Sequence, residues 1–302
     1  MRLAEIHSSE LTADCLRKVY HRLMGEVSGE ATTALYRGLV AGRACALMHQ
    51  QGFDQDPFNL TIAAASDTQK QLSEENRMLT QSVEENHQDI LAEVSNVLIL
   101  YRDRFAFMFD QCELLGTEVP ARYTLKTDGG EVKFASHLDL LVRDTNGVFG
   151  CGRGKLLVMD WKWRQQAPSH HYLARNMQFA LYYMMAKFGH LKCGPKAFEW
   201  MDYGEDAVLF WIKPYTRRTT AYNDKSEEQE FVKGDLRPMR SVLYQVEYDT
   251  AQERQIKAEL EMRAKMVEND VFPLNPDPVS CRICDAEAFC TRFDTANIGD
   301  SQ

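Results

Sequence analysis

The sequence of 302 residues has no run of about 18 apolar residues, and its first residues, MRLAEIHSSELTADC, lack the pattern of a secretory signal peptide. These two absences predict a soluble cytoplasmic protein with no membrane partner. The composition has no disordered or collagen-like bias, and the 44% hydrophobic content is sufficient for the core of one large domain spanning residues 1–302. The phosphate-binding pattern G-x-x-x-x-G-K-[ST] is also missing, so a motor activity would require a partner.

An excess of positive charge is likewise missing, because the formal net charge is −9. This value argues against indiscriminate adhesion to nucleic acid. It leaves room for a local basic groove, since net charge governs the distant field and a single site can differ from it in sign.

Polar residues stand where apolar ones are expected in the stretch Leu156–Lys162. In an extended strand the side chains alternate, so Asp160 and Lys162 share one face. If the chain folds back near Phe149 and Gly150, an antiparallel strand sets Asp139 opposite Asp160. Two carboxylates so placed hold Mg²⁺ or Mn²⁺ through hard oxygen ligands. Lys162 then positions a water molecule or neutralises the transition state, an arrangement that suits hydrolysis of a phosphodiester.

The segment that follows reads as an amphipathic helix with a polar face. Spacings of four, three and four residues put its polar members on one side, where they can reach phosphates or bases: His171, Arg175, Gln178 and Tyr182. Taken alone, each of the main candidates is equally compatible with an ordinary solvated position: Asp139, Asp160, Lys162, Gln178 and Tyr182.

The ordered series Asp139, Asp160-Trp161-Lys162 and Gln178 to Tyr182 resembles the D…(D/E)-x-K…Q-x-x-x-Y series of RecB-type nucleases in the PD-(D/E)XK superfamily. The resemblance implies a metal-dependent deoxyribonuclease with Asp139 and Asp160 as metal ligands and Lys162 as the catalytic lysine. Gln178 and Tyr182 would orient the substrate or the hydrogen bonds of the site. It further implies an exonuclease on single-stranded or frayed DNA ends, in recombination, repair or phage DNA processing.

The chain departs from that family at the Gly-x-x-x-His motif that helps to hold the metal. The motif has a histidine four residues after the glycine. Here Gly38 is followed at that distance by Gly42, and Gly42 by Ala46, so the histidine is missing. His49 lies one turn beyond, and we favour a surface histidine over a ligand there. Glu118 is another candidate ligand, although a surface role at the start of a strand is equally compatible.

The missing histidine keeps a second hypothesis open, in which the fold is retained but the protein only binds DNA or a partner such as a helicase, recombinase or integrase. A restriction-type endonuclease shares the same chemistry, but nothing in the sequence indicates base-specific reading. The sequence leaves open whether the substrate is DNA or RNA, in which direction it is digested, and the oligomeric state.

The fold class expected is α/β, with a PD-(D/E)XK restriction-endonuclease-like core of a mixed central sheet flanked by helices. Its expected parts are an N-terminal helical part at 1–66, a helical arm at 67–111, the catalytic core at 112–249 and a C-terminal part at 250–302. Within these parts we expect the following elements: a helix at 32–51, strands at 118–125, 207–215 and 241–249, a turn at 128–130 and a helix at 250–268.

Eight cysteines in a reducing compartment favour metal ligands or buried thiols over disulfides. Cys281, Cys284 and Cys290 form C-x₂-C-x₅-C after a proline-punctuated loop, and Cys15 is the natural fourth ligand. The setting resembles the iron–sulfur nucleases among the RecB-like proteins, including the CRISPR-associated family and helicase–nuclease subunits. That resemblance implies a 4Fe-4S cluster that joins the N- and C-terminal segments, with Zn²⁺ as the alternative that spacing alone leaves open. The other four cysteines are not expected to be ligands: Cys45, Cys112, Cys151 and Cys193.

Overall fold

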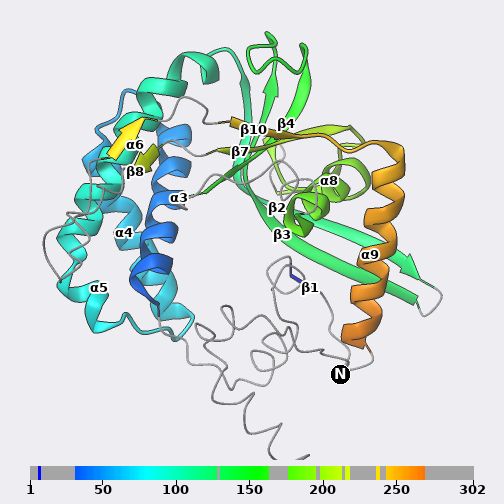
Figure 1. Ribbon diagram of the computed structural model, residues 1–302, viewed down its shortest axis with the longest axis horizontal. Helices are drawn as coiled ribbons and strands as arrows, with labels where there is room; N and C mark the ends of the chain where they lie inside the picture. Colours follow the sequence, from blue (N-terminus) through cyan, green and yellow to red (C-terminus); the bar gives the residue numbers. More distant parts are fainter. Residues whose placement is uncertain are drawn as a thin grey trace, which may run out of the picture.

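The computed structural model describes residues 31–127, 130–162, 176–194, 198–212 and 243–268, together with short strand segments at 6–7, 215–217 and 236–238. One central sheet lies between two groups of helices (Figure 1). No helix in these ranges is long and apolar enough to cross a membrane.

The central sheet has eight strands in the order β10-β7-β4-β3-β2-β5-β6, with β1 pairing alongside β3. The β4–β7 and β1–β3 pairs are parallel and the others antiparallel, which confirms the mixed sheet that the sequence predicts. A small hairpin, β8 and β9, stands apart. The strands are β1 (Ile6–His7), β2 (Glu113–Thr127), β3 (Gly130–Asp144), β4 (Lys155–Trp161), β5 (His190–Leu191), β6 (Met201–Asp202), β7 (Ala207–Ile212), β8 (Tyr215–Arg217), β9 (Leu236–Pro238) and β10 (Leu243–Val246).

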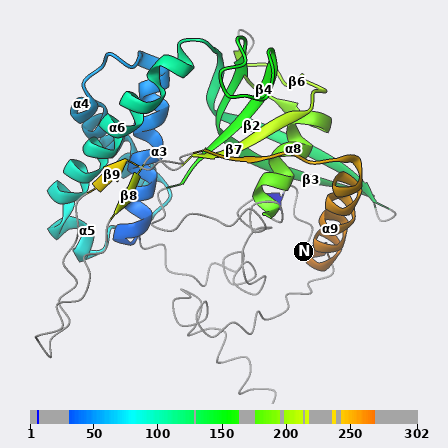
Figure 2. The ribbon, with the colours of Figure 1, turned by 45° about the horizontal axis from the view of Figure 1, so that its top comes forward.

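Helices cover both faces of this sheet, as Figure 2 shows from a second direction. The helices are α3 (Thr33–Gln51), α4 (Pro57–Glu74), α5 (Gln81–Glu85), α6 (His87–Phe109), α8 (Met177–Phe188) and α9 (Thr250–Glu268). Helices α3 to α6 pack on one face and α8 and α9 on the other, so two hydrophobic cores form with the sheet between them. We call these the α3-side core and the α8-side core.

The helical segment differs from the arm expected at 67–111. Helix α4 begins ten residues earlier, at Pro57, because the Asp56 carboxylate accepts hydrogen bonds from the N–H groups of Phe58 and Asn59 and caps the first turn. A break then separates α4 from α5 and α6. Both long helices bury apolar side chains in the α3-side core, so they form a layer of the domain that packs on the sheet.

The turn between β3 and β4 is organised by one buried carboxylate. Asp144 is fully buried, and its two oxygens accept hydrogen bonds from the N–H groups of Gly147, Val148 and Phe149 at 2.7, 2.9 and 2.9 Å. Buried backbone donors need such partners, so this carboxylate stabilises the turn. The turn returns β4 antiparallel to β3, with Asp144 paired to Lys155.

An aromatic cluster lies behind the last residue of β4, on the α3 side. The ring of His49 stacks on Trp161 at 5.8 Å between centroids and meets Phe109 edge-on at 4.5 Å. The Tyr101 hydroxyl accepts from Trp161 Nε1 at 3.2 Å and lies 2.8 Å from His49 Nε2. Burial lowers the pKa of His49 to about 3. The prediction of a surface histidine is therefore wrong, because the half-buried ring of His49 packs against aromatic side chains of α6 and β4.

This burial predicts a pH dependence of stability. An unfolded histidine takes up a proton near pH 6.5, whereas folded His49 stays neutral down to about pH 3, so acidification below 6.5 favours the unfolded chain. Between pH 7 and pH 5.5 this residue should remove about 1 kcal/mol from the free energy of unfolding. Urea denaturation at both pH values should show that His49→Gln loses correspondingly less stability than the parent.

His190→Gln is the matched control, because His190 is exposed and its replacement should leave the pH dependence of the parent in place. Equal losses of stability in the parent and in His49→Gln would contradict the neutral state of this histidine.

Candidate active site

The candidate site is built around the end of β4. Side chains alternate along this strand as predicted: Leu156 and Val158 pack in the α8-side core, while Leu157 and Met159 pack in the α3-side core. Asp160 is fully buried, and Lys162 follows it two residues later. The Lys162 Nζ lies 2.7 Å from Asp160 Oδ2 and 2.9 Å from Oδ1, so the ammonium balances the charge of a carboxylate that has left water.

Helix α8 holds this lysine from the other side. The Asn176 side chain caps the helix by accepting from the N–H groups of Gln178 and Phe179. Lys162 Nζ donates to Gln178 Oε1 at 3.2 Å, and Gln178 Nε2 donates to the Tyr182 hydroxyl at 2.6 Å. The structure thus brings four of the predicted site residues into one chain of contacts running from Asp160 to Tyr182.

The remaining predicted members of this helical face, His171 and Arg175, lie outside the described residues. Burial raises the pKa of the Tyr182 hydroxyl, and the nearby charges of Asp139 and Asp160 raise it further. Tyr182 is therefore a neutral hydrogen-bonding group at neutral pH.

Asp139 lies on β3 at the point where β3 stops pairing with β4. The last pair between the two strands is Leu140 with Met159, and one further step of the same register sets Asp139 across from Asp160. The backbone N–H of Trp161 donates to Asp139 Oδ2 at 3.0 Å. This hydrogen bond ties the Asp139 carboxylate to the strand that carries Asp160 and Lys162.

Glu118 continues the row on the other side of Asp139. The β2–β3 pairs Thr117 with Leu140 and Val119 with Leu138 flank it, and the same register sets Glu118 across from Asp139. At Glu118 the backbone φ is +48°, a left-handed conformation that costs energy for a non-glycine residue. Three carboxylates on three neighbouring strands therefore meet at one place in the sheet.

Strand β3 changes sides at this place. On β3, Leu138 belongs to the α8-side core and Leu140 to the α3-side core, although two residues of a regular strand would point the same way. The irregularity brings Asp139 within electrostatic reach of Asp160 and Tyr182 as well as of Cys45 on α3. The kink therefore lets groups from both sides of the sheet converge.

The crowding of negative charge shows in the pKa values. Burial raises the pKa of Asp139 well above its usual range, the charge of Asp160 raises it further, and Lys162 opposes the change. Burial also raises the pKa of Glu118, while the charge of Arg43 on α3 lowers it. A bound cation would offset the negative charge of this row of carboxylates. Carboxylate oxygens are the ligands that Mg²⁺ and Mn²⁺ prefer.

Within the described part of the chain, no group of three or more His, Cys, Asp and Glu side chains is placed so that it could hold a metal ion. His49 does not supply the missing ligand, since its Nε2 faces Tyr101 on the α3 side of β4. Helix α3 instead contributes the charge of Arg43, which sequence reasoning missed. Its only signal was a cation between the small residues Gly42 and Ala44.

The predicted cluster ligands Cys15, Cys281, Cys284 and Cys290 lie outside the described residues. The other four cysteines are free thiols in the structure: Cys45, Cys112, Cys151 and Cys193.

Comparison with protein families gives a match over most of the chain. The family model described as "PD-(D/E)XK nuclease superfamily" matches residues 9–291. No curated protein matches the chain. Among solved structures, the one titled "Crystal structure of SSO0001" is 14% identical, covering 92% of this chain and 93% of that chain, with a TM-score of 0.31, and no argument rests on it. The match to the family model covers most of the sequence, including every residue of the row of carboxylates, and the chain therefore belongs to the PD-(D/E)XK nuclease superfamily.

Proposed function

We propose that this protein is a divalent-metal-dependent deoxyribonuclease that acts as an exonuclease on single-stranded or frayed DNA ends. One observation carries the proposal: Glu118, Asp139 and Asp160 lie in one row across β2, β3 and β4, beside the ammonium of Lys162. Members of the superfamily are nucleases that use divalent metals, and this row has the chemistry to hold Mg²⁺ or Mn²⁺.

Each residue has a separate task in this proposal. Asp139 and Asp160, with Glu118 as a third candidate, would hold the cation, which when bound would lower the pKa of a water molecule and stabilise charge on the phosphate. Lys162 is within hydrogen-bonding distance of Asp160 and of Gln178, so it can orient the attacking water or balance charge at the scissile phosphate. Gln178 and Tyr182 keep the ammonium in place through their hydrogen bonds.

The finer parts of the proposal rest on the RecB-type motif series. That resemblance supports an exonuclease in recombination, repair or phage DNA processing, in the cytoplasm, with a helicase or recombinase as a possible partner. The alternative is a DNA-binding or partner-recruiting protein without turnover, which the absent Gly-x-x-x-His histidine favours.

Replacing the lysine tests the catalytic reading. With Mn²⁺ or Mg²⁺, the parent should release label from end-labelled single-stranded DNA, and Lys162→Ala should reduce the rate by about 10²- to 10⁴-fold because the transition-state charge loses its partner. Lys155→Ala is the matched control, since Lys155 is an exposed lysine on the same strand.

DNA binding by Lys162→Ala should persist. If the parent also binds DNA but releases no label from it, the alternative holds, and the protein recruits DNA without cutting it.

Glu118→Gln tests the third ligand. Removing one charged oxygen donor should weaken Mn²⁺ binding by about tenfold or more, a loss visible in the free Mn²⁺ signal of electron paramagnetic resonance without any turnover. Glu113→Gln on the same strand is the control, because Glu113 is exposed and pairs with Arg143. Identical Mn²⁺ affinities in the two variants would remove Glu118 from the site.

The cysteine proposal has its own test. The C-x₂-C-x₅-C spacing, with Cys15, supports a 4Fe-4S cluster of structural and DNA-positioning role, with Zn²⁺ as the alternative. Anaerobically purified protein should contain iron and inorganic sulfide in equal amounts and absorb broadly in the visible range. The Cys284→Ser variant should lose that absorption. If the parent protein is colourless and contains stoichiometric zinc, the metal is zinc and the iron–sulfur assignment is wrong.

A further inference from the structure

The β2–β3 hairpin has a polar face that leads directly away from the row of carboxylates. On β2, the residues that pack in the α8-side core are Val119, Ala121, Tyr123 and Leu125. The alternating residues point the other way, and Arg122, Thr124 and Lys126 are exposed there. This outer face therefore starts at Glu118 and runs along the hairpin toward its tip.

Two short strands extend the same face sideways. Arg122 pairs with His190 of β5, and His190 pairs with Asp202 of β6. The N–H of Lys192 donates to the carbonyl of Pro120, one pleat nearer to Glu118. Since side chains alternate with a period of two, Lys192 and Trp200 share the outer face with Arg122.

Trp200 gathers two cations on this face. The Arg122 guanidinium carbon lies 4.3 Å from the centre of the indole ring, and the Lys192 Nζ lies 4.9 Å from it. An aromatic ring attracts cations to its faces and so holds both side chains close together. The result is a pair of positive charges whose positions are fixed before any ligand arrives.

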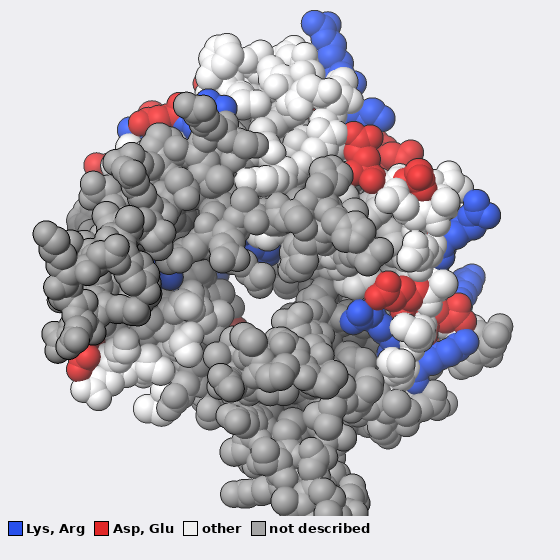
Figure 3. Space-filling view, in the orientation of Figure 1, with Lys and Arg blue, Asp and Glu red and all other residues white. Residues whose placement is uncertain are grey.

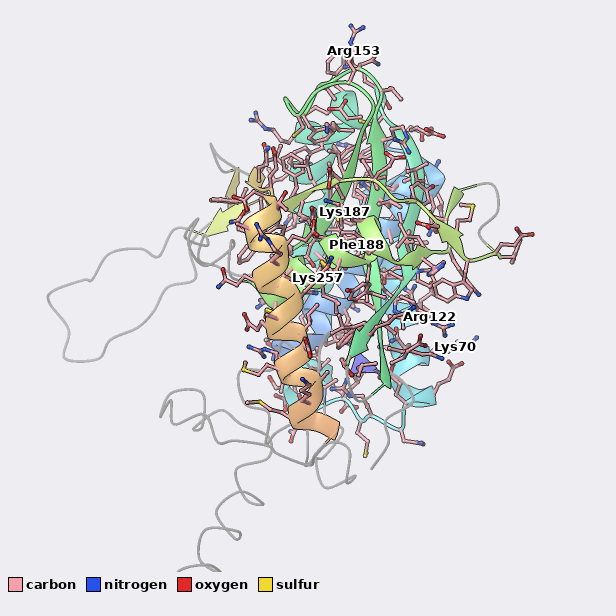
Figure 4. The ribbon with its side chains drawn as sticks, turned by 90° about the vertical axis from the view of Figure 1, so that its right-hand side faces the viewer. Lys70, Arg122, Arg153, Lys187, Phe188 and Lys257 are labelled. Atoms are coloured by element: carbon pink, nitrogen blue, oxygen red, sulfur yellow. The ribbon has the colours of Figure 1, made fainter. Side chains whose placement is uncertain are left out.

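The charge of the face contrasts with that of the whole chain, which is −9. Apart from the site itself, its exposed or half-exposed charged members are Arg122, Lys126, Lys133 and Lys192 against Glu131 and Asp202, with His137 and His190 beside them. Figure 3 looks onto the opposite side of the molecule, where Lys and Arg side chains stand close to Asp and Glu side chains on the described surface around α9. Figure 4 shows Arg122 well apart from α9, in agreement with an outer position.

We propose that this face binds one strand of DNA, with Arg122 and Lys192 on its phosphates and Trp200 as their aromatic support. The proposal rests on the proposed nuclease function and names the path by which the substrate reaches the carboxylates. Arg122 is four residues from Glu118 on one strand, about 13 Å, which is roughly two nucleotides of an extended chain. Two cations on one aromatic ring fit the phosphates of a single strand, and aromatic side chains with basic neighbours are typical of single-strand grooves.

The test measures binding without cleavage. Fluorescence anisotropy with a short single-stranded DNA in EDTA gives the dissociation constant at several salt concentrations. The double substitution Arg122→Ala and Lys192→Ala should weaken binding and lower the slope of log affinity against log salt by about 1.4, since each phosphate contact on single strands contributes about 0.7.

A control removes the same charge from the opposite face. Lys257→Ala with Lys265→Ala on α9 changes two cations that form (i, i+4) ion pairs, and should leave the slope unchanged. Trp200→Leu, which keeps both cations and removes their support, should weaken binding with a smaller change in slope. Thermal unfolding of each variant separates loss of the surface from loss of the fold.

An unchanged slope in the Arg122/Lys192 variant would overturn the proposal. Equal losses on duplex DNA, or a larger loss on single-stranded RNA, would also overturn the assignment to one strand of DNA. A parent that binds through this face without cutting would leave the surface standing while the nuclease proposal fails. If the Arg122/Lys192 double variant binds DNA normally and still cleaves it, the nuclease proposal would stand and the surface proposal would fail.

Discussion

The buried contact between Asp160 and Lys162 is the constraint on which the arrangement of the site depends. A carboxylate with no exposed surface must be balanced by a nearby positive charge, and here the balancing ammonium is itself held by Gln178 of α8. Through that contact the end of β4 fixes where α8 packs. The same strand also donates its Trp161 N–H to Asp139, so one short segment arranges groups from three elements.

The sheet lets these groups meet because its two faces are not equivalent at this place. Helices α3, α4 and α6 build one core and α8 and α9 build the other, while the kink at Glu118 and Asp139 breaks the alternation between them. Lysines of α8 and α9 stay occupied elsewhere: Lys187 forms ion pairs with Asp206 and Glu253, and Lys187, Phe188 and Lys257 lie together (Figure 4). The charged groups of the site and those of the α8–α9 contact are therefore separate.

Sequence reasoning reached the parts of the site that local periodicity controls. The alternation along Leu156–Lys162 and the four-residue spacing of Gln178 and Tyr182 each follow from the geometry of one element, and the fold-back that faces Asp139 with Asp160 follows from a glycine-rich turn. The mixed sheet and the strands at 207–212 and 243–246 follow from the same kind of pattern.

The parts it did not reach depend on long-range packing. The left-handed φ of Glu118 and the approach of Arg43 arise where β2, β3 and α3 meet, and no local pattern encodes them. The geometry of helical neighbours predicts a surface position for His49, whereas Tyr101, 52 residues away, gives it a hydrogen-bond partner from the core. The early start of α4 was missed although Asp56 and Pro57 form an ordinary capping signal.

The Asp144 turn has an evolutionary consequence. Five residues of β3, about 16 Å, separate this turn from Asp139, yet its three backbone hydrogen bonds set the register that pairs β3 with β4. A slip of one residue would turn every side chain of β4 to the opposite face and part the two aspartates. Natural variants should therefore accept changes of length at the β2–β3 tip more readily than at this turn, because the length of the turn decides which residues face each other at the other end of the β3–β4 pair.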